Sequence, residues 1–404
     1  MNDSMLEERR PVYDFDYIAG ADVLKDVHEA YLNLKKNAPP LFWTTRHGGH
    51  WVANSADVAV KALRHPEIFS SKFLSIPPNP QQPKMIPESL DPPEHRPYRQ
   101  MLRPFFEGKA IAPLEPRIIE WTEELVGKVV DKGGCEFVED IAGPLPISVF
   151  MEIFGFPLDR YEEFRTLALN YFSAGNGSES GLAYVGQIQQ ILVELIQSRM
   201  AEPRSDLVSS LVTMDFEGRK LTFEELMSIG FLMFLAGLDT VTNALTYGMR
   251  HLAHDPALQQ RMAEDPDCIP NAVEELLRRY TFVSTPRYLV QDTEIDGIQL
   301  RKGESILVPL HSVGLDDKLN PNPETVDVDR PAVRHAAFGS GVHTCLGLHL
   351  ARMEMINFYK VWFRRIPRFE LAPMDGPLKF RAGSVQSIEA LPIRWARCVA
   401  MLWP

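Results

Sequence analysis

The sequence predicts a mainly helical protein with a small β-rich region. Apolar residues recur at helical spacing over residues 113–155 and 158–200, and the longest predicted helix covers about residues 222–253. Strand-like patterns are restricted to three short stretches, at residues 41–53, 286–310 and 378–395. Because the helical stretches are much longer, we expect helices to build most of the core.

The N-terminal part is predicted to contain two short helices separated by a hairpin. Helical patterns cover residues 23–36 and 55–64. Between them, residues 41–45 and 50–53 flank a turn at Gly48-Gly49. Two short apolar runs around such a turn are typical of a β-hairpin.

A proline-rich stretch follows at residues 70–93. It holds seven of the 32 prolines in the chain, a density at which no regular element can form. Apolar residues are dispersed through it, among them Phe73 and Met85. These apolar residues favour a loop that acts as a functional lid. A plain surface linker is the alternative.

Composition bounds the class of protein. The 404 residues would allow two or three domains by length alone, and the net charge of −12 argues against nucleic acid as a partner. None of the four cysteines forms a C-x-x-C pair, so we expect neither a zinc knuckle nor a disulfide framework, which suits the cytoplasm. The first ten residues are polar, and the most apolar run, residues 229–238, is short. We therefore expect no membrane anchor.

A glycine-rich loop at residues 338–347 contains the most informative motif. Cys345 is expected where this loop meets the next predicted helix, whose first amides favour a thiolate. Gly339 and Gly341 allow backbone angles that other residues avoid, and Gly347 allows a flat ligand to approach the backbone. A buried cysteine that acts as a small hydrophobic residue is the alternative.

A second motif places two donor side chains on one face of a predicted helix. His95 and Arg99 are four residues apart, so both project from the same side. Together they could hold a carboxylate. A solvated basic face is the alternative that this pair leaves open.

The longest predicted helix carries polar residues in its apolar middle. Thr222 and Glu225 predict a capping box at its start. Asp239 and Thr240 lie near its centre, where polar groups are costly unless they are paired or used. Gly237 is a poor helix former, which permits local opening or close approach of a ligand. A satisfied polar pair is the alternative to a functional one.

The loop spacing Phe-x-x-Gly-x-His-x-Cys-x-Gly resembles the haem-ligand loop of the cytochrome P450 family. The resemblance implies one domain over residues 1–404, with haem b (iron protoporphyrin IX) between the long central helix and the Cys-loop helix. It implies Cys345 as the iron ligand. It also implies a set of propionate ligands, namely His95, Arg99, Arg287 and His343.

Two further features fit the same family. Glu275 and Arg278 match its Glu-x-x-Arg pair, which supports the haem-binding core. Residues 48–51, 91–94 and 237–240 resemble the camphor-hydroxylating bacterial branch. The branch implies a cytoplasmic monooxygenase that uses O2 and receives electrons from a two-iron ferredoxin and a flavin-dependent ferredoxin reductase.

The sequence departs from that branch at two places. The tyrosine that binds the camphor ketone is missing, and Pro83 stands closest by spacing. The basic residues that partner the helix aspartate are absent near residues 165–175, although Arg165 lies nearby. Substrate identity and proton relay are therefore expected to differ from those of the camphor enzymes.

The resemblance implies hydroxylation of a small apolar substrate of the monoterpenoid or norisoprenoid class. Asp239 would relay protons, and Thr240 would hold the activated oxygen species. The expected substrate contacts are Phe73, Met85, Leu232, Leu235, Ala236, Val283, Ser384 and Val385. A non-catalytic haem sensor and a peroxide-driven haem enzyme are the alternatives, and the acid–alcohol pair argues against both.

Four arginines are expected near the face that carries Cys345. They are Arg96, Arg99, Arg330 and Arg334. On an acidic protein such a basic patch would steer an acidic ferredoxin toward this face.

Overall fold

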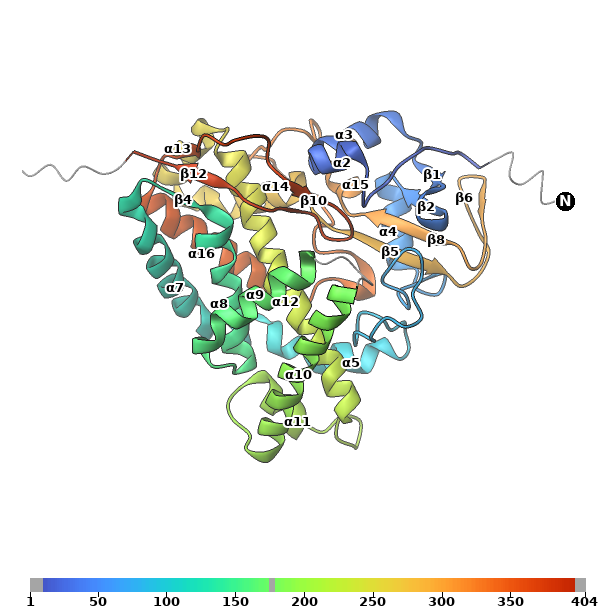
Figure 1. The fold of residues 1–404 in the computed structure, drawn as a ribbon. Helices are drawn as coiled ribbons and strands as arrows, with labels where there is room; N and C mark the ends of the chain where they lie inside the picture. The colour runs from blue at the N-terminus through green and yellow to red at the C-terminus, as the bar shows by residue number, and fades with distance from the viewer. Residues whose placement is uncertain (1–9, 174–178, 397–404) are drawn as a thin grey trace, which may run out of the picture.

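The computed structural model describes residues 10–173 and 179–396, and it is mainly helical, as the sequence predicts (Figure 1). The helices are α2 (Ala21–Lys25), α3 (Val27–Asn37), α4 (Ala56–Arg64), α5 (His95–Leu102), α6 (Gly108–Ile111), α7 (Glu115–Val129), α8 (Pro144–Phe154), α9 (Tyr161–Ser173), α10 (Glu179–Ala201), α11 (Leu207–Thr213), α12 (Phe223–Leu252), α13 (Pro256–Glu264), α14 (Ile269–Arg279), α15 (His311–Gly314) and α16 (Leu348–Arg365). The strands are β1 (Leu41–Thr44), β2 (His50–Ala53), β3 (Phe69–Ser70), β4 (Gly134–Glu136), β5 (Ser284–Leu289), β6 (Thr293–Ile295), β7 (Ile298–Leu300), β8 (Ser305–Pro309), β9 (Glu370–Leu371), β10 (Phe380–Arg381), β11 (Ser387–Ile388) and β12 (Pro392–Arg394).

Helix α12 runs through the middle of the molecule (Figure 1). Its capping box forms as predicted, because Thr222 Oγ1 accepts from the N–H of Glu225 while the Glu225 carboxylate accepts from the N–H of Thr222. By length and composition alone α12 could cross a membrane, yet 56% of its most apolar window is buried inside the protein. It packs against α8, α10 and α14, so its apolar sequence is explained by its central position.

The largest sheet has five strands in the order β1-β2-β8-β5-β3 and lies beside the N-terminal helices (Figure 1). The predicted hairpin pairs Trp43 of β1 with Trp51 of β2 in an antiparallel register. β2 then pairs in parallel with β8, and β8 pairs antiparallel with β5. This sheet fixes the position of β5, which carries Arg287.

One strand interrupts a stretch that the sequence predicts as helical. Within residues 113–155, Gly133 adopts a left-handed conformation with φ 77°, which ends the helical segment after α7. β4 follows and pairs with β12 from the C-terminal segment, whose strand character was predicted. The chain then forms a π-helical turn at Val138–Ala142, and α8 begins at Pro144, a residue that is favoured in the first turn of a helix.

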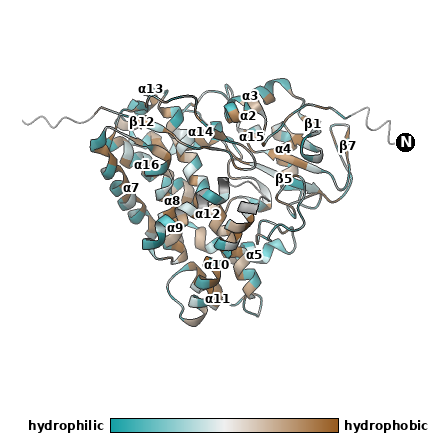
Figure 2. Ribbon diagram, viewed as in Figure 1, coloured by the Kyte–Doolittle hydropathy of each residue, from teal (hydrophilic) through white to brown (hydrophobic). Residues whose placement is uncertain are grey.

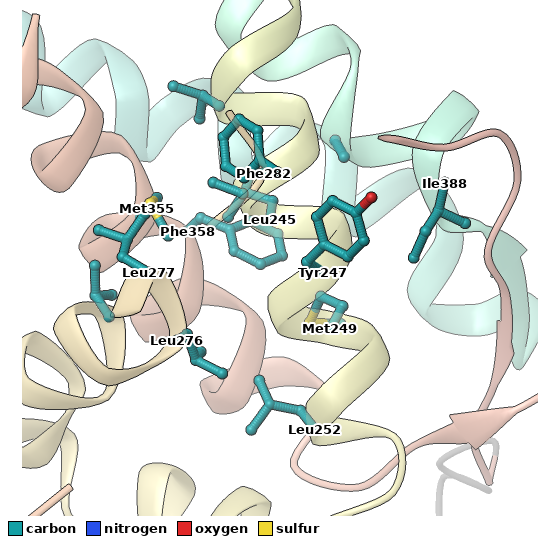
Figure 3. Close-up of a cluster of buried hydrophobic side chains, with 14 of the residues drawn as sticks. Leu245, Tyr247, Met249, Leu252, Leu276, Leu277, Phe282, Met355, Phe358 and Ile388 are labelled. Carbon is teal, nitrogen blue, oxygen red and sulfur yellow. The ribbon is translucent and has the colours of Figure 1, made fainter. Parts of the chain in front are cut away.

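Hydrophobic side chains form the core around α12. One buried cluster surrounds its C-terminal half and includes Leu245, Tyr247 and Met249 (Figure 3). Another contains Phe150 of α8 and Phe234 of α12. The outer helix α7 interleaves hydrophobic and hydrophilic residues (Figure 2), as expected for a helix that buries one face.

Candidate active site

A cavity of about 320 Å³ lies between the middle of α12, the glycine-rich loop and the start of α16. Residues that are far apart in the sequence meet in its wall. The predicted site residues that line it are Arg99, Leu232, Ala236, Thr240, Val283, Arg287, His343 and Cys345. The fold therefore gathers most of the predicted cofactor residues and the predicted oxygen-activating alcohol around one space.

Backbone geometry shapes the loop that carries Cys345. The N–H of Cys345 donates to the carbonyl of Phe338 at 2.8 Å. Gly339 and Gly341 have φ values of 72° and 78°, which glycine adopts readily, as predicted. Among the described residues, only Sγ of Cys345 lies within 4 Å of where a Cβ on Gly347 would be, at 4.0 Å. The backbone at Gly347 is thus open to a flat ligand.

Two influences act in opposite directions on the Cys345 thiol. Removal from solvent raises its pKa, while the N–H of Gly347 and the charge of Arg99 lower it. The amide at the start of the next helix therefore acts in the predicted direction. A coordinated metal cation deprotonates a thiol outright, so bound iron would complete the conversion to thiolate.

Three of the predicted propionate ligands form a buried group. His95 packs edge-on against His343, with ring centroids 4.6 Å apart. Across the described parts of the chain, Nε2 of His95 and both ring nitrogens of His343 have no hydrogen-bond partner. Arg287 is 3% exposed and donates through Nη1 to Thr285 Oγ1 and the Pro286 carbonyl. Unpaired buried nitrogens beside a buried guanidinium fit the carboxylates of a bound haem.

Arg99 completes this group from the next turn of α5. It lies one turn after His95, as predicted, and its Nη2 donates to the carbonyl of Thr344. Burial, together with the charges of His343 and Arg99, lowers the pKa of His95 to about 4. The His95 ring is therefore neutral near pH 7 and offers a hydrogen bond to a carboxylate, while the arginines supply the charge.

Sequence reasoning missed Glu88, which also lines the cavity. Its Oε2 lies 3.6 Å from Nδ1 of His343. Burial raises the pKa of Glu88, but contact with His343 and the charges of Arg287 and Arg99 outweigh it and lower the pKa overall. The usable signal was that Glu88 is one of only two acidic residues, with Asp91, in the proline-rich stretch at residues 70–93.

Asp239 has a basic partner, which the sequence analysis did not identify. Its Oδ2 accepts from Nη2 of Arg381 at 2.9 Å and from Nδ2 of Asn243 at 2.9 Å. Burial raises the pKa of Asp239, and the charge of Arg381 and the Asn243 hydrogen bond oppose the rise. The partner comes from β10 and not from the region of residues 165–175, where the sequence analysis looked for it. The side chain of Arg165, the nearby alternative, lies outside the described residues.

Helix α12 continues without a break through the predicted site. Thr240 faces the cavity, and its Oγ1 donates to the carbonyl of Ala236 at 2.9 Å. A Cβ on Gly237 would lie 2.9 Å from Cδ2 of Phe150. Gly237 therefore permits close packing of α8 against α12, and the helical opening that we considered is not observed.

The apolar wall matches the predicted substrate contacts only in part. Leu232, Ala236 and Val283 line the cavity. The other predicted contacts, Phe73, Met85, Leu235, Ser384 and Val385, do not belong to its lining. Val385 forms a β-bridge with Val283, Phe73 packs edge-on against Tyr288, and Met85 lies in the core cluster around α8 and α12. The wall instead uses aromatic residues that were not predicted, Phe106, Phe150, Phe154 and Phe282.

The Glu-x-x-Arg pair forms a buried ionic cluster. Glu275 Oε1 accepts from Nε of Arg278 at 2.7 Å, with both side chains 0% exposed. Arg330 adds a second contact to Glu275 at 2.8 Å, and its side chain is 6% exposed. Arg330 is therefore not part of a surface patch, which corrects that expectation. Arg96 and Arg334 are exposed.

Comparison with known proteins identifies relatives over nearly the whole chain. Residues 168–381 match the family model described as Cytochrome P450. A probable cytochrome P450 127A1 from Sinorhizobium fredii is 32% identical over 92% of this chain and 90% of the relative.

Solved structures give the same fold. The crystal structure of CYP101J2 aligns with a TM-score of 0.87 and 35% identity, covering 96% of this chain and 97% of that one. The crystal structure of CYP101C1 aligns with a TM-score of 0.89 and 32% identity, covering 98% of this chain and 100% of that one. Agreement over such lengths extends to the helices and sheet that form the cavity.

Proposed function

Because the chain belongs to the cytochrome P450 family, we propose that it inserts one oxygen atom from O2 into a small apolar substrate of the monoterpenoid or norisoprenoid class. The protein is a monooxygenase, and its cofactor is haem b. The observation that carries the proposal is one apolar cavity that Cys345 lines from the glycine-rich loop and Thr240 lines from α12.

The residues around the cavity fit haem b. When bound, the cofactor supplies a thiolate-ligated iron at which O2 is activated. Cys345 would ligate the iron. Arg99 and Arg287 would bind the propionates through charged hydrogen bonds, and His95 and His343 would donate through their Nε2 atoms, which have no hydrogen-bond partner in the described chain.

Asp239 and Thr240 would deliver protons to the reacting oxygen. Burial raises the pKa of the Asp239 carboxyl, and the Arg381 and Asn243 contacts hold it in place, so this carboxyl is suited to pass a proton toward the cavity. The Thr240 hydroxyl faces the cavity, donates to the Ala236 carbonyl and can accept one further hydrogen bond. Asp239 would thus supply the proton, and Thr240 would hold the oxygen species in place.

We expect Thr240→Ala to uncouple oxygen consumption from product formation. Without the hydroxyl, NADH and O2 are still consumed, but peroxide is released in place of product. The fraction of NADH that yields product should fall by more than about tenfold, because positioned proton transfer contributes about 10²–10⁴-fold to a rate. Measuring NADH, O2 and peroxide together tests this role.

Thr240→Ser serves as the matched control, because it keeps the hydroxyl and removes only a methyl group. Coupling in the serine variant should stay near that of the natural protein. If Thr240→Ala is coupled as well as the natural protein, Thr240 has no such role.

The expected substrate is less dependent on a hydrogen bond than camphor. Pro83, which stands closest by spacing to the missing tyrosine, lines a separate surface groove of about 760 Å³ and offers no phenol to the cavity. The wall is built from residues such as Phe106, Phe150 and Val283. A ketone bound in a site that has no hydrogen-bond donor loses about 1–3 kcal/mol of binding free energy, compared with a site that supplies a donor.

A spectral titration should therefore rank the ligands. We expect β-ionone to shift the haem spin state at lower concentration than camphor and to be hydroxylated with better coupling. Tyr171 or Ser384 could replace the lost phenol, and tight camphor binding with oxidation at one carbon would support that alternative. If camphor behaves so while ionones give no spin shift, the proposed substrate class is wrong.

The proposed electron donors are a two-iron ferredoxin and a flavin-dependent reductase in the cytoplasm. The two CYP101 structures support a protein of this bacterial type. A ligand sensor would have no use for the buried acid beside Thr240, and a peroxide-driven enzyme would need no proton relay. Oxygen uptake that requires the ferredoxin system would separate the monooxygenase from both alternatives.

A further inference from the structure

The ion pair between Asp239 and Arg381 joins the centre of α12 to the C-terminal hairpin. Arg381 ends β10, which pairs with β11 in an antiparallel register. β11 packs against α12, and the N–H of Gly383 donates to the carbonyl of Tyr17. The guanidinium of Arg381 therefore reaches Asp239 from a segment that is anchored at both sides.

Polar residues continue from Asp239 along one face of α12. Asn243 and Tyr247 follow at intervals of four residues, which places all three on the same side of the helix. Asn243 donates to Asp239. Tyr247 is 0% exposed, and its hydroxyl has no hydrogen-bond partner in residues 10–173 and 179–396. Its hydroxyl points toward the segment that carries Ile388 of β11 (Figure 3).

A second ion pair lies at the outer end of this face. Nη2 of Arg250 donates to Oδ2 of Asp26, and both side chains are partly exposed, at 21% and 17%. The Arg250 guanidinium lies over the ring of Phe380, 5.2 Å from its centroid, next to Arg381. Solvent thus reaches the outer pair, whereas Asp239 is buried.

Tyr247 lies between the two ion pairs. Burial raises the pKa of its phenol, and Arg250, Asp26, Arg381 and Asp239 are all close enough to act on it electrostatically. The neutral ring of His28 packs edge-on against it at 4.4 Å. A buried hydroxyl that lacks a partner is a site for an internal water. A phenol can both accept and donate a proton, whereas arginine keeps its own.

We propose that Arg381 positions Asp239 for proton release, and that protons from solvent enter beside the Asp26–Arg250 pair and reach Asp239 through Tyr247 and internal water. Each proton that leaves the Asp239 carboxyl is replaced by one from this path, so the carboxyl returns to its starting state. The inference rests on the proposed relay role of Asp239.

Substitutions of Arg381 test the positioning role. The haem-loaded enzyme would be driven by NADH through a two-iron ferredoxin and its reductase, with β-ionone as the probe. Arg381→Gln should lower the rate of product formation by about tenfold and enlarge the solvent deuterium isotope effect, because proton supply becomes limiting. Arg381→Lys should restore most of the rate and bring the isotope effect back near that of the natural protein. A lysine variant as slow as the glutamine variant would show that the positive charge is not what Asp239 requires.

Tyr247→Phe tests the path. It removes only the unpartnered hydroxyl, so the fold and the β-ionone spin shift should be unchanged, while product formation slows and its solvent isotope effect grows. Tyr359→Phe is the matched control, because Tyr359 is also a buried tyrosine whose hydroxyl lacks a partner among the described residues, but it lies on α16. Equal isotope effects in both variants would overturn the path.

Asp239→Asn separates this inference from the function on which it rests. If Asp239→Asn turns over like the natural protein, the relay role itself fails. If Asp239→Asn is slow while Arg381→Gln and Tyr247→Phe match the natural protein in rate and isotope effect, only the present inference is wrong.

Discussion

Replacing Cys345 with histidine should abolish both the thiolate spectrum and monooxygenation. An imidazole can still bind haem iron, but it does not donate electron density as a thiolate does. The reduced carbonyl complex should therefore lose its strongly red-shifted Soret band, and product should fall to background. Persistence of that band in Cys345→His would mean that another residue ligates the iron.

Cys268→Ala is a suitable control for this substitution. Cys268 is buried in the core cluster around α12 and does not line the cavity. Its loss should lower stability through packing alone and leave the Soret band in place. A loss of the band in Cys268→Ala as well would point to general haem loss and not to ligation by Cys345.

The second large effect is expected at Glu275. Glu275→Ala would leave Arg278 buried without its counter-ion, since both side chains are 0% exposed. Removing one partner of a buried pair costs about 3–5 kcal/mol. The free energy of unfolding should fall by this amount in denaturant titration, although no atom of Glu275 touches the cavity.

An exposed ion pair provides the comparison. Arg261 and Asp329 pair at 2.5 Å with side chains 41% and 66% exposed. Arg261→Ala should lower the free energy of unfolding far less than Glu275→Ala, because solvent screens such pairs. If the two substitutions destabilise the protein equally, burial does not explain the importance of Glu275.

Much of the fold followed from local signals in the sequence. The capping box at Thr222, the hairpin around Gly48-Gly49 and the glycine-rich loop were each predicted from neighbouring residues and are observed. β4 was missed for the opposite reason. It exists because β12, about 250 residues away, pairs with it, and a local pattern carries no information about such a partner.

The site residues also fall into two groups, those that a local motif predicts and those that only the fold brings together. Cys345, Arg99 and Thr240 belong to compact motifs, and they line one cavity as the motifs suggested. Arg381 and Glu88 belong to no motif, so only the three-dimensional arrangement places them near Asp239 and His343. The role of a charged residue depends on what folds against it, and the sequence around that residue does not state this.

The place of Arg381 in the chain has a consequence for synthesis. Proteins are made from the N-terminus, and domains fold as their segments emerge. Asp239 would be synthesised 142 residues before its ionic partner. Until the last β-strands leave the ribosome, the acid in the middle of α12 has no counter-ion, and β4 has no strand to pair with. A chain that stalls during translation before residue 381 would therefore keep an unpaired carboxylate in its apolar centre. Such a chain should be less stable and more readily degraded by quality-control proteases.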